Sequence, residues 1–142
     1  MNDKYLYSAK RTDNGEWVEG YYANCLFPSS DVRTGHFIIE YPGEYHEIFT
    51  STICQCTGLK DKNGKMIWEN DICRRILLPT KRIEKNFRIA YVPYKCCLSA
   101  IDLDGSNITF LSDYINNQYE VEVIGNIFDE GSENIGKGAE EN

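Results

Sequence analysis

The sequence predicts a mainly β protein, from its residue composition and from three turn signals. Residues that favour strands (Ile, Val, Tyr, Thr, Phe and Trp) number 45, whereas Ala, Leu and Met together number 15. Branched and aromatic side chains lose rotamer freedom against a helical turn and pack well on a pleated surface. The dipeptides Asn14-Gly15, Asn63-Gly64 and Asp104-Gly105 each lie between β-like runs. Such dipeptides tolerate the positive φ of type I′ turns and therefore predict three hairpins.

In chain order, the predicted hairpins join residues 5–10 to 17–22, the run ending at Leu59 to 66–68, and 97–103 to 108–111. Further strands are expected at residues 36–41, 45–50, 71–77, 87–92 and 119–128. The last of these begins with Val121 and Val123 alternating with glutamates, which indicates one apolar and one polar face. Ser112 is expected to cap one helical turn over residues 112–117.

Length and charge limit the class of protein. A chain of 142 residues suits one domain, or two very small ones. Charged residues interrupt every window long enough to span a membrane, and the N-terminus lacks the apolar core of a secretory signal. Without a sign of export, the expected location is the cytoplasm, with reduced and mostly structural thiols. There are six cysteines: Cys25, Cys54, Cys56, Cys73, Cys96 and Cys97.

Charge is unevenly distributed along this acidic chain, whose formal charge is −7. The tail 129–142 is acidic with one large apolar residue and is expected to be disordered. Residues 74–95 carry seven basic residues against Glu84 alone, with aromatic residues between them. This composition suits phosphate contacts and base stacking. The acidic net charge of the chain favours the other interpretation, in which these cations pair with the protein's own acids. The candidate nucleic-acid-binding residues are Arg74, Arg75, Lys81, Arg82, Lys85 and Arg88.

No motif for catalysis or metal binding emerges. Zinc ligation by Cys54, Cys56, Cys96 and Cys97 is disfavoured, because adjacent strand residues point to opposite faces. His36 and His46 lack the spacing of known zinc motifs and are expected to be surface or structural groups. The Asp-rich turns at 61–64 and 102–105 lack the glycine and glutamate positions of a calcium loop. The sequence thus predicts no catalytic residue, metal or cofactor, and a non-enzymatic protein.

Three stretches together resemble one family: YSAKRTDNGEWVEGYY, QCTGLKDKNGKMIWENDIC and EVEVIGNIFD. They look like the YopX family of phage and prophage proteins of Gram-positive and other bacteria. The resemblance implies a mainly β fold with an SH3-like barrel in the C-terminal part and a small N-terminal β region packed beside it. The implied regions are residues 1–50 and 51–128, followed by the acidic tail 129–142. It implies no activity, substrate or cofactor.

The match has local departures. The family usually has glycine where Asn70 stands, and asparagine is the next-best residue for left-handed backbone. Cys54 and Cys56 replace a glycine and an aromatic residue, which makes a cysteine-specific family function unexpected. Residues 74–117 match poorly, so the basic segment inherits no role from the family.

The leading functional hypothesis is a non-enzymatic module that binds a protein partner through loops or a sheet edge; this step rests on analogy between folds. The alternative is a nucleic-acid-binding protein that uses the basic segment 74–95, which the net negative charge disfavours. Exposed strand edges in a small β domain are often paired, which favours a homo-oligomer. No membrane partner is expected.

Overall fold

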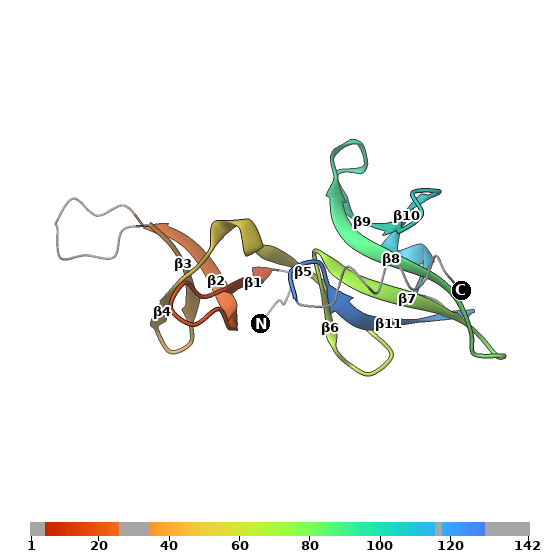
Figure 1. The fold of residues 1–142 in the computed structure, drawn as a ribbon, viewed down its shortest axis with the longest axis horizontal. Helices are drawn as coiled ribbons and strands as arrows, with labels where there is room; N and C mark the ends of the chain where they lie inside the picture. Colours follow the sequence, from red (N-terminus) through yellow and green to blue (C-terminus); the bar gives the residue numbers. More distant parts are fainter. Residues whose placement is uncertain (1–4, 26–34, 116–117, 130–142) are drawn as a thin grey trace. The chain divides into compact units, whose positions relative to one another are not determined.

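The computed structural model describes residues 5–25, 35–115 and 118–129. Within these ranges the regular elements are β-strands and short 3-10 helices, and no α-helix occurs. The strands form two antiparallel sheets, one of six strands and one of five (Figure 1). The prediction of a mainly β protein is therefore confirmed. None of the described helices is both long and apolar enough to cross a membrane.

The chain divides into two compact units, Met1–Cys56 and Thr57–Asn142. The division falls within strand β5 (Cys54–Lys60). All of the predicted acidic tail except Asp129 lies outside the described residues.

The first unit is an antiparallel sheet in the order β4-β3-β2-β1, and the first residues of β5 pair with β1. A small core of Ala9, Val18, Ile38 and Ile48 lies against this sheet. Gly20 is required where β2 meets β3, because a Cβ there would lie 2.3 Å from the Ile39 carbonyl oxygen. The elements of this unit are β1 (Tyr7–Lys10), β2 (Trp17–Cys25), β3 (Gly35–Glu40), β4 (Glu44–Glu47) and the 3-10 helix η2 (Thr50–Thr52).

The second unit contains the five-stranded sheet, in the order β10-β9-β8-β7-β11. Its strands are β7 (Asp71–Leu77), β8 (Arg82–Val92), β9 (Cys97–Asp102), β10 (Ile108–Phe110) and β11 (Tyr119–Asn126). Strand β6 (Met66–Trp68) also lies in this unit and pairs with β5 in the six-stranded sheet. Two 3-10 helices, η3 (Pro93–Lys95) and η4 (Leu111–Asp113), flank β9 and β10 in sequence. The core of this unit consists of Ile67, Cys73, Phe87, Ile89, Ala100, Leu111, Tyr114 and Val121.

The three predicted hairpins are confirmed, and their turns differ from the predicted type. Strands β1 and β2, β5 and β6, and β9 and β10 are neighbours in their sheets. Gly15, Gly64 and Gly105 have φ of +72°, +81° and +76°, but the residue before each glycine does not have positive φ. A type I′ turn needs two such residues in succession, so these turns are not of that type.

Two other local predictions have different outcomes. Asn70 has φ of +71°, as expected where the family usually has glycine. The helical turn begins at Leu111, and Ser112 lies inside it without capping it. Residues 116 and 117 of the predicted turn lie outside the described residues.

Both sheets are open, and no closed barrel is formed by the part of the chain that the structure describes. The strand β8 curves along its length in Figure 1. The confirmed part of the fold prediction is thus the mainly β class, and the sheets are open where the resemblance implies a barrel.

Candidate functional site

The register of the five-stranded sheet separates the basic candidates onto two faces. Arg75 lies directly opposite Lys85, whereas Ile72 lies opposite Arg88. Residues directly opposite share a face, and successive residues of a strand alternate between faces. Arg75 and Lys85 therefore lie on the face that carries the core residue Cys73, and Arg74 and Arg88 lie on the other.

Three of the six candidates form ion pairs with acids of this chain. Arg74 Nε lies 3.3 Å from Glu122 Oε1, although this contact lacks hydrogen-bond geometry. Arg75 Nη2 donates to Glu84 Oε1 over 3.1 Å, and Lys85 Nζ donates to Asp102 Oδ2 over 2.9 Å. The other three, Lys81, Arg82 and Arg88, make no ion pair with the described residues. The segment is therefore not one continuous cationic surface.

Asp102 is the centre of a buried polar network in the second unit. Its side chain is 2% exposed and accepts hydrogen bonds from Lys85 and from the Tyr114 hydroxyl, both over 2.9 Å. Ser106 and Asn107, in the turn between β9 and β10, donate to the same carboxylate over 3.3 and 3.4 Å. The sequence showed Asp102 only as part of a turn that resembles a calcium loop. With four donors, its carboxylate fixes the turn and η4 in place.

Arg75 extends this network through two aromatic contacts. Its guanidinium lies 4.4 Å from the ring centroids of both Tyr114 and Tyr119. The hydrogen bond to Asp102 raises the pKa of Lys85, and burial raises the pKa of Tyr114. Lys85 is therefore held charged and Tyr114 neutral at neutral pH. We interpret the network as stabilising the fold, because each charged side chain in it already contacts an opposite charge, a hydrogen-bond partner or an aromatic ring.

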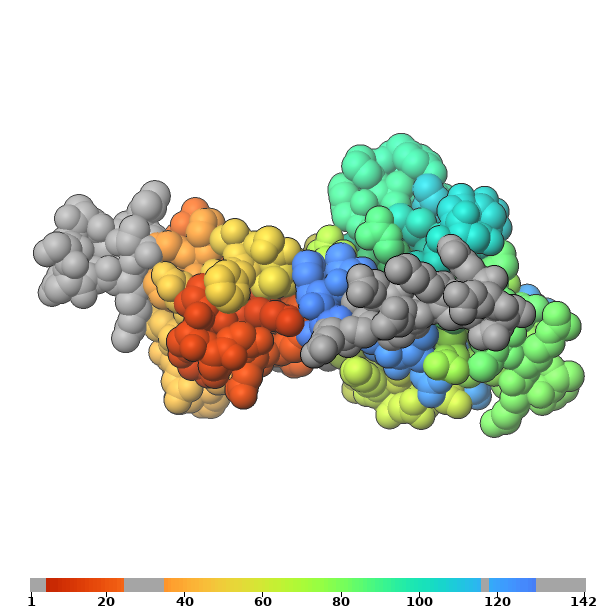
Figure 2. Space-filling model, viewed as in Figure 1, coloured from red at the N-terminus to blue at the C-terminus, as the bar shows by residue number. Residues whose placement is uncertain are grey.

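The edge strand β10 exposes apolar side chains. Ile108 and Phe110, two residues apart on one face, are 39% and 47% exposed, and Tyr94 is 74% exposed. Lys95 Nζ lies 4.1 Å from the ring centroid of Phe110 and 5.8 Å from that of Tyr94. Figure 2 shows the segment that holds β9 and β10, coloured green to cyan, at the surface of the molecule in this view. We call Tyr94, Lys95, Ile108 and Phe110 the β10 surface.

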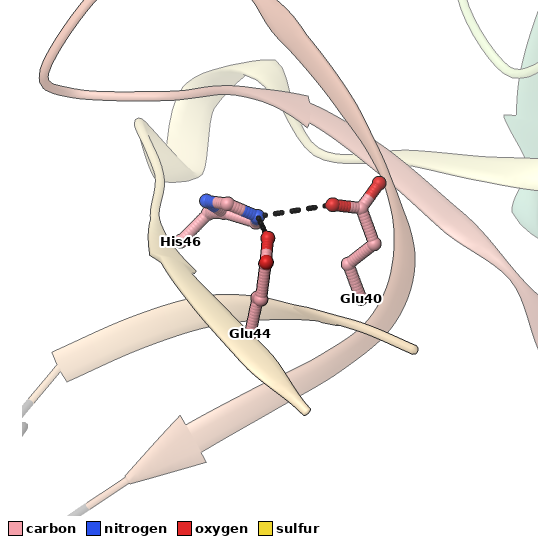
Figure 3. Close-up of side chains that lie close together, drawn as sticks. All are labelled: Glu40, Glu44 and His46. Atoms are coloured by element: carbon pink, nitrogen blue, oxygen red, sulfur yellow. Dashed lines mark hydrogen bonds and ion pairs between the residues drawn. The ribbon is translucent and has the colours of Figure 1, made fainter. Parts of the chain in front are cut away.

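A second cluster lies on the β3–β4 hairpin of the first unit, and it was not predicted from the sequence. His46 Nε2 lies 3.3 Å from Glu40 Oε1 and 3.6 Å from Glu44 Oε2. Figure 3 shows the imidazole edge of His46 turned toward both carboxylates. Among the described residues, this is the one group of three or more histidine, cysteine or acidic side chains whose ligand atoms converge. The signal in the sequence was the short spacing of the three residues around the turn at 41–43.

The remaining histidine, His36, and the described cysteines lie outside this cluster. The His36 ring stacks on Tyr22, and its Nδ1 is hydrogen-bonded to the Tyr22 hydroxyl. The side chains of Cys54, Cys56 and Cys73 are buried, that of Cys97 is half-buried and that of Cys96 is exposed. Burial raises the pKa of Cys73 far above its usual range. No described cysteine belongs to a converging group of three potential metal ligands.

Comparison with known proteins identifies one family. A family model described as "YopX protein" matches residues 3–132, which is most of the chain. No curated protein matches the sequence significantly. The matched range includes the β3–β4 hairpin, the Asp102 network and the β10 surface. The resemblance noted in the opening, central and closing stretches of the sequence is thereby confirmed, and the chain belongs to the YopX family.

Proposed function

We propose that this protein is a non-enzymatic binding module that takes up an extended segment of a protein partner along β10. The observation that carries the proposal is an edge strand with exposed apolar side chains. In the described residues β10 pairs only with β9, so its outer edge has backbone groups available to a further strand. Addition of a strand to a sheet edge is a common mode of peptide recognition.

The composition of the other edges favours β10 over them. Charged side chains on an edge strand protect it from pairing with a strand of another chain. The edge strand β4 carries Glu44 and Glu47, and β11 carries Glu120 and Glu122. The remaining edge strand, β6, has side chains that are mostly buried. Strand β10 (Ile-Thr-Phe) has no charge and exposes both of its large side chains, which makes it the edge best suited to a partner strand.

The β10 surface also indicates the character of the partner. Phe110 and Ile108 offer apolar contacts at a spacing of two residues, which matches the alternation of an extended segment. The ammonium of Lys95, held over Phe110, favours an acidic residue nearby. We expect the partner segment to carry apolar side chains at alternate positions together with at least one acid.

The finer features of the family resemblance belong to the same proposal. An SH3-like arrangement of residues 51–128 and a phage or prophage origin come from the resemblance alone. A cytoplasmic location is part of the same proposal. No catalytic step is part of the proposal.

Nucleic-acid binding through residues 74–95 is the alternative function. Its support is weaker, because Arg74, Arg75 and Lys85 already face acids of this chain. Among the candidates, Lys81 and Arg82 are exposed at the β7–β8 connection and offer the best test.

The test is a pull-down from host lysate with and without nuclease, using wild-type protein and three variants. Phe110→Asp places a charge on the β10 surface, Tyr41→Ser changes an exposed aromatic residue elsewhere, and Lys81→Glu/Arg82→Glu reverses the exposed basic charges. We expect one protein partner that survives nuclease, is lost with Phe110→Asp and is retained with the other two variants. Amide hydrogen exchange of residues 108–110 should slow when that partner is added.

Two results would overturn the proposal. Retention that disappears with nuclease and with the charge reversal would support nucleic-acid binding. A partner that binds Phe110→Asp as well as wild type would place recognition elsewhere. If the retained species is a second copy of this chain, size-exclusion chromatography at several concentrations will show a dimer that Phe110→Asp abolishes.

A further inference from the structure

We propose that Glu40, Glu44 and His46 bind a divalent transition-metal ion of the zinc class. The site lies in the first unit, and the proposal does not depend on the function proposed for β10. Glu40 ends β3, and Glu44 and His46 lie on β4 across the turn. Imidazole nitrogen and carboxylate oxygen are both ligands that zinc accepts in proteins.

The spacing of the three ligand atoms fits a tetrahedral ion. Bonds of about 2.0–2.1 Å to nitrogen and oxygen place neighbouring ligand atoms roughly 3.3–3.4 Å apart at a tetrahedral centre. The distances from His46 Nε2 to the two carboxylates are 3.3 and 3.6 Å, and all three ligand atoms lie within 4.8 Å of one another. Only a small movement of the Glu44 side chain, which is 67% exposed, is needed to close the site around an ion.

The hairpin register brings two like charges together. Glu40 and Glu44 are directly opposite each other in the β3–β4 pair. Like charges at such positions destabilise a pair of strands unless a cation lies between them. The nearby guanidinium of Arg11 is engaged with Asp13, whose carboxylate lies 2.7 Å away. A metal ion would compensate both glutamates, whereas the one hydrogen that Nε2 of His46 can carry is donated to only one of them at a time.

Burial of His46 orients the ligand set. Its side chain is 11% exposed and lies opposite Ile38, a fully buried core residue. The imidazole is therefore held in place, while the two glutamates are 49% and 67% exposed. Imidazole nitrogen favours zinc and related transition metals over calcium and magnesium, which prefer oxygen ligands. Three protein ligands leave the fourth position to water, and the ion would tie the edge strand β4 to β3.

The experiment is a zinc titration of the full-length protein, stripped with chelator and kept reduced, followed by calorimetry and by thermal unfolding. Glu44→Gln and His46→Gln remove ligands, and Glu44 is exposed enough for its variant to fold as wild type does. Glu47→Gln, on the same strand, and His36→Gln, the other histidine, are matched controls. Circular dichroism checks that each variant is folded.

We expect one zinc ion per wild-type chain and a rise in melting temperature with zinc. Binding should be at least about tenfold weaker in both ligand variants, since even loss of an outer-shell partner has an effect of that size. Both controls should bind as wild type does, and magnesium should not compete. Absence of zinc binding to wild type would overturn the proposal and leave His46 as an ion-pair partner of the glutamates. Zinc binding that is unchanged in both ligand variants would also overturn it and would direct attention to the thiols.

Discussion

Replacement of Asp102 by alanine tests whether the buried network holds the second unit together. The carboxylate is 2% exposed, and the change removes the acceptor for the Tyr114 hydroxyl and the partner of Lys85. The loss of a hydrogen bond between a buried hydroxyl and a charged acceptor lowers the free energy of unfolding by about 1.5–3 kcal/mol. The Lys85 side chain is one-third exposed and can turn to water, so its lost ion pair costs about 0–1 kcal/mol. The expected loss in the free energy of unfolding is therefore about 1.5–4 kcal/mol.

The assay is urea denaturation followed by tryptophan fluorescence. Trp17 lies in the first unit and Trp68 in the second, so all variants carry Trp17→Phe and the signal reports the second unit. Lys85→Met is the matched control, because it removes the ion pair and leaves the Tyr114 hydrogen bond intact. It should cost less than Asp102→Ala, because the buried carboxylate keeps the hydrogen bonds from Tyr114, Ser106 and Asn107. Asp102→Asn keeps one carbonyl oxygen and should fall between the two.

Two results would refute this reasoning. A loss below about 0.5 kcal/mol for Asp102→Ala would show that the network contributes little to stability, as for an ordinary surface substitution. A loss for Lys85→Met equal to that for Asp102→Ala would show that the ion pair, rather than the tyrosine hydrogen bond, dominates.

Three further predictions concern single residues. Burial raises the pKa of Asp71 to about 7, against the opposing hydrogen bond from the Trp68 amide. The folded state therefore holds a proton that the unfolded chain releases, and the free energy of unfolding should fall by on the order of 4 kcal/mol between about pH 4 and pH 7. Denaturation of wild type and Asp71→Asn at several pH values measures this loss. A difference in stability between the two proteins that does not change with pH would contradict it. Asp61 accepts backbone hydrogen bonds from Asn63 and Lys65 over 2.9 Å and from Val123 over 3.0 Å, which lower its pKa although desolvation alone would raise it. Asp61→Ala should cost roughly 2–4 kcal/mol in urea denaturation, and a cost no larger than that of Lys62→Ala would refute the anchoring role. In the native protein, iodoacetamide should modify the exposed Cys96 first and the buried Cys73 only after unfolding; peptide mass spectrometry over time decides the order, and early labelling of Cys73 would contradict its burial.

Local features of this fold could be predicted from the sequence because they depend on neighbouring residues. Alternating side chains and turn glycines identified the strands, and Asp71–Leu77 was predicted with the bounds that the structure shows. The left-handed backbone at Asn70 followed from the glycine that the family usually has there. The turn types were less predictable, because hydrogen bonds such as that from the Arg11 amide to the Glu16 carbonyl set the loop length.

The partners of charged side chains were not readable from the sequence. The sequence favoured pairing of the basic segment 74–95 with the protein's own acids, with nucleic-acid contact as the alternative, but it could not name the acids. Which acid each cation meets depends on strand register, and the β7–β8 register shifts between Arg75 and Ile76. A shift of one residue moves side chains to the opposite face. The contact between Asp102 and Lys85 likewise depends on the pairing of β9 with β8.

The sequence by itself determined that this protein is built from short strands, that glycines lie at its turns and that it resembles the YopX family. Backbone preference and side-chain alternation act over a few residues, so they can be read along the chain. Only the tertiary structure decided that β10 forms an uncharged edge and that Glu40, Glu44 and His46 converge. Both features arise from which strands pair and in what register. That choice is made by the free energy of the whole sheet and its core, rather than by any single segment.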